Sequence, residues 1–234
     1  MAPATSSLVL TVLMGVLLVG VVAILSRLED WRSYTPLSDV GGALGERTGY
    51  GHEEKPGGLI RWFTTVDHKD IGILYGIYGV IAFAWGGVSV LLMRTELAAP
   101  AENVIGPSLY NGLMTSHGIT MLFLFGTPMI AAFGNYFIPL LIGADDMAFP
   151  RINAIAFWLL PPGAILIWAG FFIPSIATAQ TAWTMYTPLS IQMSSAAVDT
   201  MLLGLHLTGV SATMGAINFI ATIFTERGDD VGWP

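Results

Sequence analysis

Five long apolar stretches run along the chain, separated by more polar segments. The hydrocarbon core of a bilayer is about 30 Å thick, and an α-helix of roughly 20 apolar residues crosses it. The pattern therefore predicts an all-α fold, a polytopic membrane helix bundle of about five transmembrane helices. The predicted spans are Leu8–Leu25, Ile71–Met93, Leu109–Ile142, Ala154–Ile173 and Val198–Phe224.

Prolines mark two of these spans as irregular. The third span is longer than a bilayer requires and contains Pro128 and Pro139, so we expect a kink and a frayed inner end. The fourth span contains Pro161 and Pro162. These are compatible with a membrane helix if neighbouring groups satisfy the carbonyls that the prolines leave without a donor.

Composition agrees with a membrane protein and excludes several other classes. The chain is 54% hydrophobic and only 11% charged, with a mean hydropathy of +0.68, whereas a soluble domain carries about 25% charged residues. It has no cysteine, which excludes disulfides and thiolate metal sites. With a net charge of −7 and no basic patch, we expect no nucleic-acid partner.

The distribution of basic residues predicts three regions and an orientation. Residues 1–25 hold an extra N-terminal span, which we expect to be retained because no Lys or Arg precedes its long apolar run. Residues 26–70 form a polar, glycine-containing linker, and residues 71–234 form the core. Six Lys and Arg lie in the linker, one is Arg151 and one is Arg227, so eight of nine fall on one side of the membrane. The positive-inside rule then places the N-terminus outside and the C-terminus in the cytoplasm, in a cell membrane.

The candidate chemistry lies at the two ends of the third span. His117 falls in its outer half, and an ionisable residue within hydrocarbon is costly enough to suggest function. A neutral imidazole is a common metal ligand, although a buried histidine bonded to a neighbouring helix is the alternative. Asp145 and Asp146 follow the inner end. For His206 we expect an interhelical hydrogen bond, and His52 and His68 in the polar segment need no metal.

Several short motifs occur in one order along the chain. They are Thr65–Gly72, His117-Gly118, Phe133–Arg151, Trp183–Leu189 and Ile217–Ile220. Together they resemble subunit I of the haem–copper terminal oxidases, the cytochrome c oxidase family, from about Arg61 to Pro234. The resemblance covers the first four core spans and implies that this chain is the N-terminal part of such a subunit, preceded by the extra span.

The resemblance implies one side of a haem site. His117 is similar to the outer-half axial ligand of the low-spin haem, of the haem a type, and Gly118 would leave room for the flat macrocycle. Arg94 would lie near a polar haem substituent, or else snorkel at the end of its span. Trp183 and Tyr186 would approach the haem propionates, or else belong to an interfacial aromatic belt.

The resemblance also implies the entrance of a proton-uptake channel. Asp146 matches an aspartate at the channel mouth, although a helix cap is an alternative role that does not exclude the first. The polar residues that would line the file of water behind it are Asn135, Asn153, Asn218 and Tyr75. The chain departs from the family pattern at three positions of this path, which are Asp145 for a proline, Ala154 for an asparagine and Ala212 for a serine.

By resemblance the complete enzyme would reduce oxygen to water and pump protons, with electrons from cytochrome c or a small copper protein. A high-spin haem and copper are expected there, with ligands that are absent from this chain. The expected partners are the remaining part of subunit I, subunit II, other oxidase subunits and membrane lipid.

Three alternatives stay open. One is a quinol oxidase of the same family. Some of these enzymes bind quinol through an arginine, an aspartate and a histidine, and the matching positions here hold Trp85, Ser89 and Leu109, which disfavours this alternative. The chain could also be a haem-free structural or assembly subunit. A proton-coupled transporter would predict an internal repeat between span pairs, for which the sequence offers no convincing match.

Overall fold

The computed structural model describes residues 58–98, 100, 104–193 and 195–232. These residues form helices and connecting turns, and no strand occurs among them. Four helical segments in this part are long and apolar enough to cross a membrane: His68–Glu96, Pro107–Ile142, Pro150–Phe172 and Ala196–Thr225. The predicted polytopic helix bundle is thereby confirmed. The predicted first span, Leu8–Leu25, lies outside the described residues.

A short helix, α2 (Leu59–Thr64), belongs to a compact unit separate from the one that holds all later helices. Its apolar side chains Leu59, Ile60 and Phe63 are exposed. The guanidinium of Arg61 lies 5.4 Å from the ring centroid of Trp62, a cation–π arrangement.

The second unit begins with α3 (His68–Glu96), whose start is fixed by a carboxylate cap. The side chain of Asp67 accepts hydrogen bonds from the backbone N–H groups of Lys69 and Asp70, at 2.9 and 3.2 Å. Such a cap satisfies donors that the first turn of a helix leaves free. His68 is therefore the first helical residue, and it lies buried in the bundle with only 2% of its surface exposed.

The over-long third span is one continuous helical segment with a change of winding. It consists of α4 (Pro107–Ile119), the π-helix η2 (Thr120–Gly126) and α5 (Thr127–Ile142). Pro128 directly follows η2, so the missing N–H falls where the winding of the segment changes. At the inner end Gly143 adopts φ 69°, a left-handed conformation that closes the helix and favours glycine. The π-helix therefore starts three residues after His117, and widened turns of this kind are frequent at functional sites.

The remaining spans pack closely through glycines. The fourth is divided into α6 (Pro150–Trp158) and α7 (Leu160–Phe172), with both prolines in the first turn of α7. A loop and the short α8 (Leu189–Gln192) lead to α9 (Ser195–Thr225). A Cβ added at Gly204 of α9 would lie 2.6 Å from the carbonyl oxygen of Gly163 of α7, so these two backbones approach as only small residues allow.

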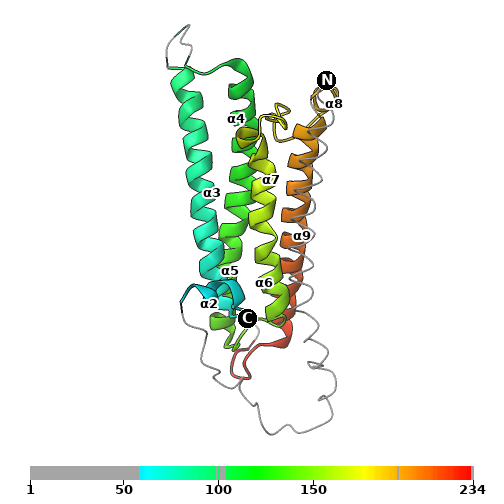
Figure 1. Cartoon of the computed structure of the whole chain (residues 1–234). Coiled ribbons are helices and arrows are strands. Elements are labelled where there is room, and N and C mark those ends of the chain that lie inside the picture. Colours follow the sequence, from blue (N-terminus) through cyan, green and yellow to red (C-terminus); the bar gives the residue numbers. More distant parts are fainter. Residues whose placement is uncertain (1–57, 99, 101–103, 194, 233–234) are drawn as a thin grey trace. The chain divides into compact units, whose positions relative to one another are not determined.

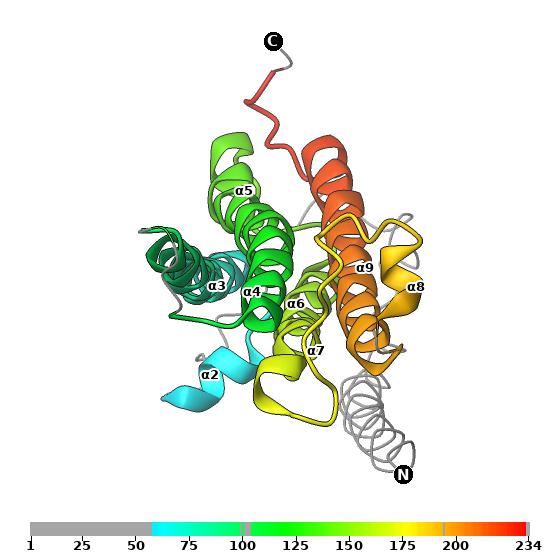
Figure 2. The ribbon, with the colours of Figure 1, turned by 90° about the horizontal axis from the view of Figure 1, so that it is seen from above.

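Within this unit, α3 packs against α4, η2 and α5, while α9 packs against α6, α7 and α5 (Figure 1). Seen along the helices, α6 and α7 lie between α4 and α9 (Figure 2). The shared core includes Ile71, Ile119, Leu124, Phe157 and Met201, all buried. This arrangement brings α3 onto α4 around His117 and gathers α3, α5, α6 and α9 around Asp146.

Candidate functional site

The side chain of His117 is held in one orientation by the backbone of α3. Its Nδ1 donates a hydrogen bond to the carbonyl oxygen of Gly86, at 2.9 Å. A carbonyl can only accept, so the proton of a neutral ring resides on Nδ1 and the lone pair on Nε2. A hydrogen bond of this kind fixes the tautomer of metal-bound histidines. The geometry therefore fits a single axial ligand that offers Nε2 to a haem iron.

Glycines make this contact possible. A Cβ at Gly86 would lie 2.5 Å from Sδ of Met121 and 3.7 Å from Nδ1 of His117, so a side chain there would displace the side chain of Met121 beside His117. At Gly118 a Cβ would lie 3.1 Å from Cβ of Trp183, so glycine lets this tryptophan pack closely on α4. The space that Gly118 would leave for a flat ring stays a prediction.

The loop that carries Trp183 is fastened to α4. The N–H of Ala182 donates to the hydroxyl of Thr115 at 3.0 Å, and the amide of Gln180 donates to Ser108 at 2.7 Å. Three non-glycine residues of this loop have positive φ angles: Ala177, Ala182 and Met185. Such strain persists only where the surroundings hold the backbone, often beside a ligand site.

The other residues predicted near the haem are Trp183, Tyr186 and Arg94. Trp183 is 46% exposed and Tyr186 is 76% exposed, both on the loop after α7. Arg94 is exposed in the last turn of α3, eight residues beyond Gly86, which is about 12 Å along a helix axis. The structure thus brings Trp183 next to the turn of His117. For Arg94 and Tyr186 it agrees equally with a place near the haem and with a place at the membrane interface.

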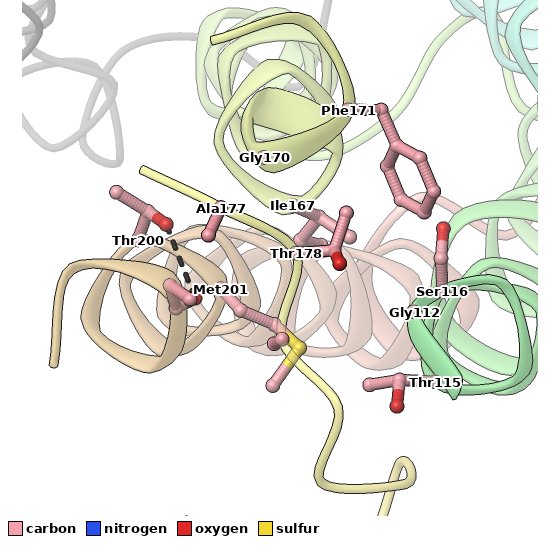
Figure 3. Close-up of a pocket in the computed structure, with 12 residues that line it drawn as sticks. Gly112, Thr115, Ser116, Ile167, Gly170, Phe171, Ala177, Thr178, Thr200 and Met201 are labelled. Carbon is pink, nitrogen blue, oxygen red and sulfur yellow. Dashed lines mark hydrogen bonds between the residues drawn. The ribbon is translucent and has the colours of Figure 1, made fainter. Parts of the chain in front are cut away.

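A small cavity adjoins the same turn of α4 (Figure 3). Its volume is about 10 Å³, room for a single water molecule. Its lining includes Thr115 and Ser116 of α4, Thr178 of the loop and Thr200 of α9. Among the described residues, no three His, Cys, Asp or Glu side chains gather into a metal site.

At the opposite end of the third span, Asp146 lies in the turn between α5 and α6. Its Oδ1 accepts a hydrogen bond from the N–H of Met147 at 2.7 Å. Burial raises the pKa of Asp146 from 3.8 to about 6; the Met147 bond and the attraction of His68 lower it, while the nearby Asp67 raises it. A carboxyl with such a pKa exchanges protons close to neutral pH. Asp146 also accepts a hydrogen bond from the backbone N–H of His68, the first residue of α3, so a capping role and a role at a channel mouth are compatible.

Behind Asp146, Asn135 of α5 and Asn153 of α6 form a buried amide pair. Nδ2 of Asn135 donates to the carbonyl oxygen of Ala131 at 2.8 Å. Its Oδ1 then accepts from Nδ2 of Asn153. Oδ1 of Asn153 is buried and has no partner in the described part of the chain. A buried acceptor without a donor is costly, so this atom marks a place for a water molecule.

A cavity continues from this pair into the bundle. Its volume is about 180 Å³, and its polar lining consists of Tyr75, Thr127, Asn135, Thr208 and Ser211. Tyr75, only 3% exposed, shares a hydrogen bond with Ser211. Ala212 also lines the cavity, where the resemblance would place a serine. Of the predicted channel residues, Asn135 and Tyr75 line this cavity and Asn153 bonds to Asn135.

Asn218 bonds to the turn that carries Asp146. Its Oδ1 accepts from the N–H of Phe149 at 2.9 Å, and its Nδ2 donates to the carbonyl of the same residue at 3.2 Å. These two bonds fix the turn, and the predicted place of Asn218 beside the channel water stays a prediction. Thr222, one helical turn further, accepts from the N–H of Ala148 at 2.9 Å.

Three residues near the predicted sites went unrecognised or were misread from the sequence. His68, assigned to the polar linker, is buried and donates from Nδ1 to the carbonyl of Asn135 at 2.8 Å. The position of His68 directly after Asp67, a typical helix-capping residue, is the sequence signal that could have placed His68 at the start of the helix. Thr222 carries no such signal. The interhelical bond expected for His206 is not found among the described residues: its Nδ1 bonds to the carbonyl of Leu202 in the same helix, and the side chain is exposed.

Comparison with known proteins gives a consistent result. Residues 70–234 match the family model described as cytochrome c and quinol oxidase polypeptide I. The chain is 88% identical to "Cytochrome c oxidase polypeptide 1" of Halobacterium salinarum over 234 residues, all of this chain and 40% of that protein. It is 48% identical to "Cytochrome c oxidase subunit 1" of Synechocystis sp. over 166 residues, 71% of this chain and 30% of that protein.

A third relative, "Cytochrome c oxidase subunit 1" of Thermostichus vulcanus, is 44% identical over 174 residues, 74% of this chain and 31% of that protein. The chain thus spans between 30% and 40% of the length of these relatives. Since the family model covers most of the chain, this membrane helix bundle belongs to the cytochrome c and quinol oxidase polypeptide I family.

Proposed function

We propose that this chain forms part of the catalytic subunit of a respiratory haem–copper oxidase. The complete assembly reduces oxygen to water with electrons from cytochrome c or a small copper protein, and couples the reaction to proton pumping. The observation that carries the proposal is the orientation of His117, whose Nδ1 is committed to Gly86 and whose Nε2 is left to bind a metal. Family membership supports the same conclusion.

His117 would hold a low-spin haem of the haem a type as one of its two axial ligands. When bound, such a haem accepts and passes on single electrons. The protein's part is to fix the ring plane and the basicity of the imidazole through Gly86. Trp183 beside His117, with Tyr186 on the same loop and Arg94, would donate hydrogen bonds to polar groups at the haem edge. The second haem and copper would take their ligands from outside this chain.

Asp146 would take up protons for the oxidase from the cytoplasm. A carboxyl with a pKa of about 6 is partly protonated at neutral pH, so it can both collect and release a proton. The proton would then pass to water held at the free acceptor of Asn153 and enter the cavity lined by Tyr75 and Ser211. Neutral amides and hydroxyls suit this task because they bind water without trapping the proton as a charge.

The orientation follows from the basic residues of the loops. With the N-terminus outside and the C-terminus in the cytoplasm, Asp146 faces the cytoplasm and His117 lies in the outer half of the membrane. The partners would be the remaining part of subunit I, subunit II and other oxidase subunits, in a cell membrane.

The aromatic packing around Trp85 favours cytochrome c or a copper protein over quinol as the electron donor. Some quinol oxidases place a charged residue at this position. Here the indole N–H of Trp85 is committed to Ser116, and its ring stacks on Trp168. A partly buried, hydrogen-bonded indole does not supply the charge that such a quinol site uses.

Substitution of His117 in the assembled oxidase tests the proposal. His117→Ala should abolish the low-spin haem band in the reduced-minus-oxidised spectrum. His206→Ala is the matched control, because His206 is also intramembrane but bonds only to its own helix among the described residues. An unchanged low-spin spectrum in His117→Ala would contradict the ligand assignment. Purified wild-type complex without haem would favour the structural or assembly subunit.

A further inference from the structure

Two tryptophans donate hydrogen bonds to hydroxyls on either side of His117. Nε1 of Trp85 on α3 donates to Oγ of Ser116 at 3.1 Å, and Nε1 of Trp168 on α7 donates to Oγ1 of Thr120 at 3.0 Å. Ser116 directly precedes His117, and Thr120 follows it by almost one turn. Both hydroxyl residues are buried, with 4% and 0% exposure, so neither bond is exchanged readily for one to water.

The two indoles act as one packed unit. Their rings are stacked, with centroids 5.0 Å apart and planes inclined by 29°. Phe171 and Phe172 of α7 pack around Trp85, at centroid distances of 5.4 and 5.5 Å. Stacked aromatic rings in such contact are rigid and have few rotamers. The donors that reach Ser116 and Thr120 are therefore fixed in space by α3 and α7 together.

The contact of Trp85 is coupled directly to that of His117. Trp85 and Gly86 are consecutive in α3, and they bond to the consecutive residues Ser116 and His117 of α4. A rotation of α4 that broke the Trp85–Ser116 bond would also turn the imidazole away from the carbonyl of Gly86. The bond from Trp85 to Ser116 thus fixes the rotation of α4 about its axis, and this rotation also sets the direction in which Nε2 of His117 points.

We propose that Trp85 and Trp168 are positioning residues for His117, whose indole N–H groups hold Ser116 and Thr120 and so set the orientation of the imidazole toward its haem. The inference rests on the proposed role of His117 as an axial ligand. It adds that the identity of two aromatic residues, which act through Ser116 and Thr120, determines the electronic properties of that haem.

The test uses the assembled oxidase with Trp85→Phe and Trp168→Phe, singly and together. Phenylalanine retains a stacked ring but removes the N–H. The readouts are the electron paramagnetic resonance g-values of the ferric low-spin haem and its midpoint potential, with haem content measured in parallel. We expect shifted g-values and a shifted potential at full haem content. Trp158→Phe, the same change at a tryptophan that packs on Phe157, should leave both unchanged.

A double-mutant cycle identifies the bond responsible. If Trp85 acts through Ser116, then Ser116→Ala should reproduce the shift of Trp85→Phe, and the double variant should shift no further than either single one. Additive shifts, or an unchanged signal in Trp85→Phe/Trp168→Phe, would overturn the proposal.

If the tryptophan variants do not assemble, Ser116→Ala and Thr120→Val decide the question, because they remove the acceptors and leave the stacked pair intact. A shifted signal supports the proposal, and an unchanged one overturns it. His117→Ala distinguishes failure of the ligand assignment from failure of the positioning role. If it retains the low-spin haem, the ligand assignment itself fails; if it loses that haem while the tryptophan and hydroxyl variants are unchanged, only the positioning role fails.

Discussion

Asp146→Asn offers the sharpest test of proton uptake, since it removes one ionisation while keeping the shape of the side chain. Burial raises the pKa of Asp146 from 3.8 to about 6. At pH 7 the protonated fraction is then roughly 150 times that of an unperturbed aspartate, a difference of about 3 kcal/mol in favour of the neutral form. In the oxidase, Asp146→Asn should slow turnover strongly and leave haem content intact.

The same shift predicts the sign of a stability effect. Because the pKa in the folded state lies above 3.8, the neutral carboxyl stabilises the fold at low pH, and this contribution is lost as the pH rises from about 4 through 6. The pKa of about 6 for Asp146 already includes the effects of its neighbours His68 and Asp67. Asn does not ionise, so Asp146→Asn should melt at a higher temperature than wild type at pH 7 but not at pH 4.

Difference infrared spectroscopy measures the ionisation directly. The C=O stretch of the protonated carboxyl, obtained as wild type minus Asp146→Asn, should titrate with a midpoint near pH 6. Asp145→Asn is the matched control, because Asp145 is the exposed neighbour in the same turn, and it should retain the band. A midpoint near 4, or unaltered turnover and proton release in Asp146→Asn, would refute the reasoning.

Three further predictions concern the surroundings of this path and the packing above it. Thr222→Val leaves the N–H of Ala148 without its acceptor, at a cost of about 1–3 kcal/mol, so hydrogen exchange of this amide should accelerate while Thr222→Ser remains protected. Asn153→Leu removes the free buried acceptor and should slow turnover about tenfold, equivalent to one hydrogen bond of roughly 1.4 kcal/mol, with haem content unchanged; full turnover would argue against water at this atom. Gly170→Ala should prevent accumulation of the folded protein, because its Cβ would overlap the backbone oxygen of Ala177, whereas Gly87→Ala, with nothing within 4 Å, should accumulate normally in a membrane-fraction assay.

Much of the fold followed from the sequence because span length and polarity are properties of a segment by itself. A run of about 20 apolar residues must form a helix in a bilayer whatever its neighbours are, since its backbone groups have no other partners. The four predicted spans that fall on described residues are therefore close to the helices found. His117 and Asp146 could be singled out for a related reason, because ionisable groups are rare in and next to such segments.

The partner of each polar side chain was decided only by the tertiary structure. Asn218 bonds to Phe149, 69 residues away, and His68 bonds to Asn135, 67 residues away. Trp85 reaches Ser116 only because α3 and α4 meet at Gly86 in one rotation. A hydrogen bond needs its two atoms within a few tenths of an ångström of the right distance. That distance is set by how the helices pack against one another, whereas hydrophobic length fixes only that each helix exists.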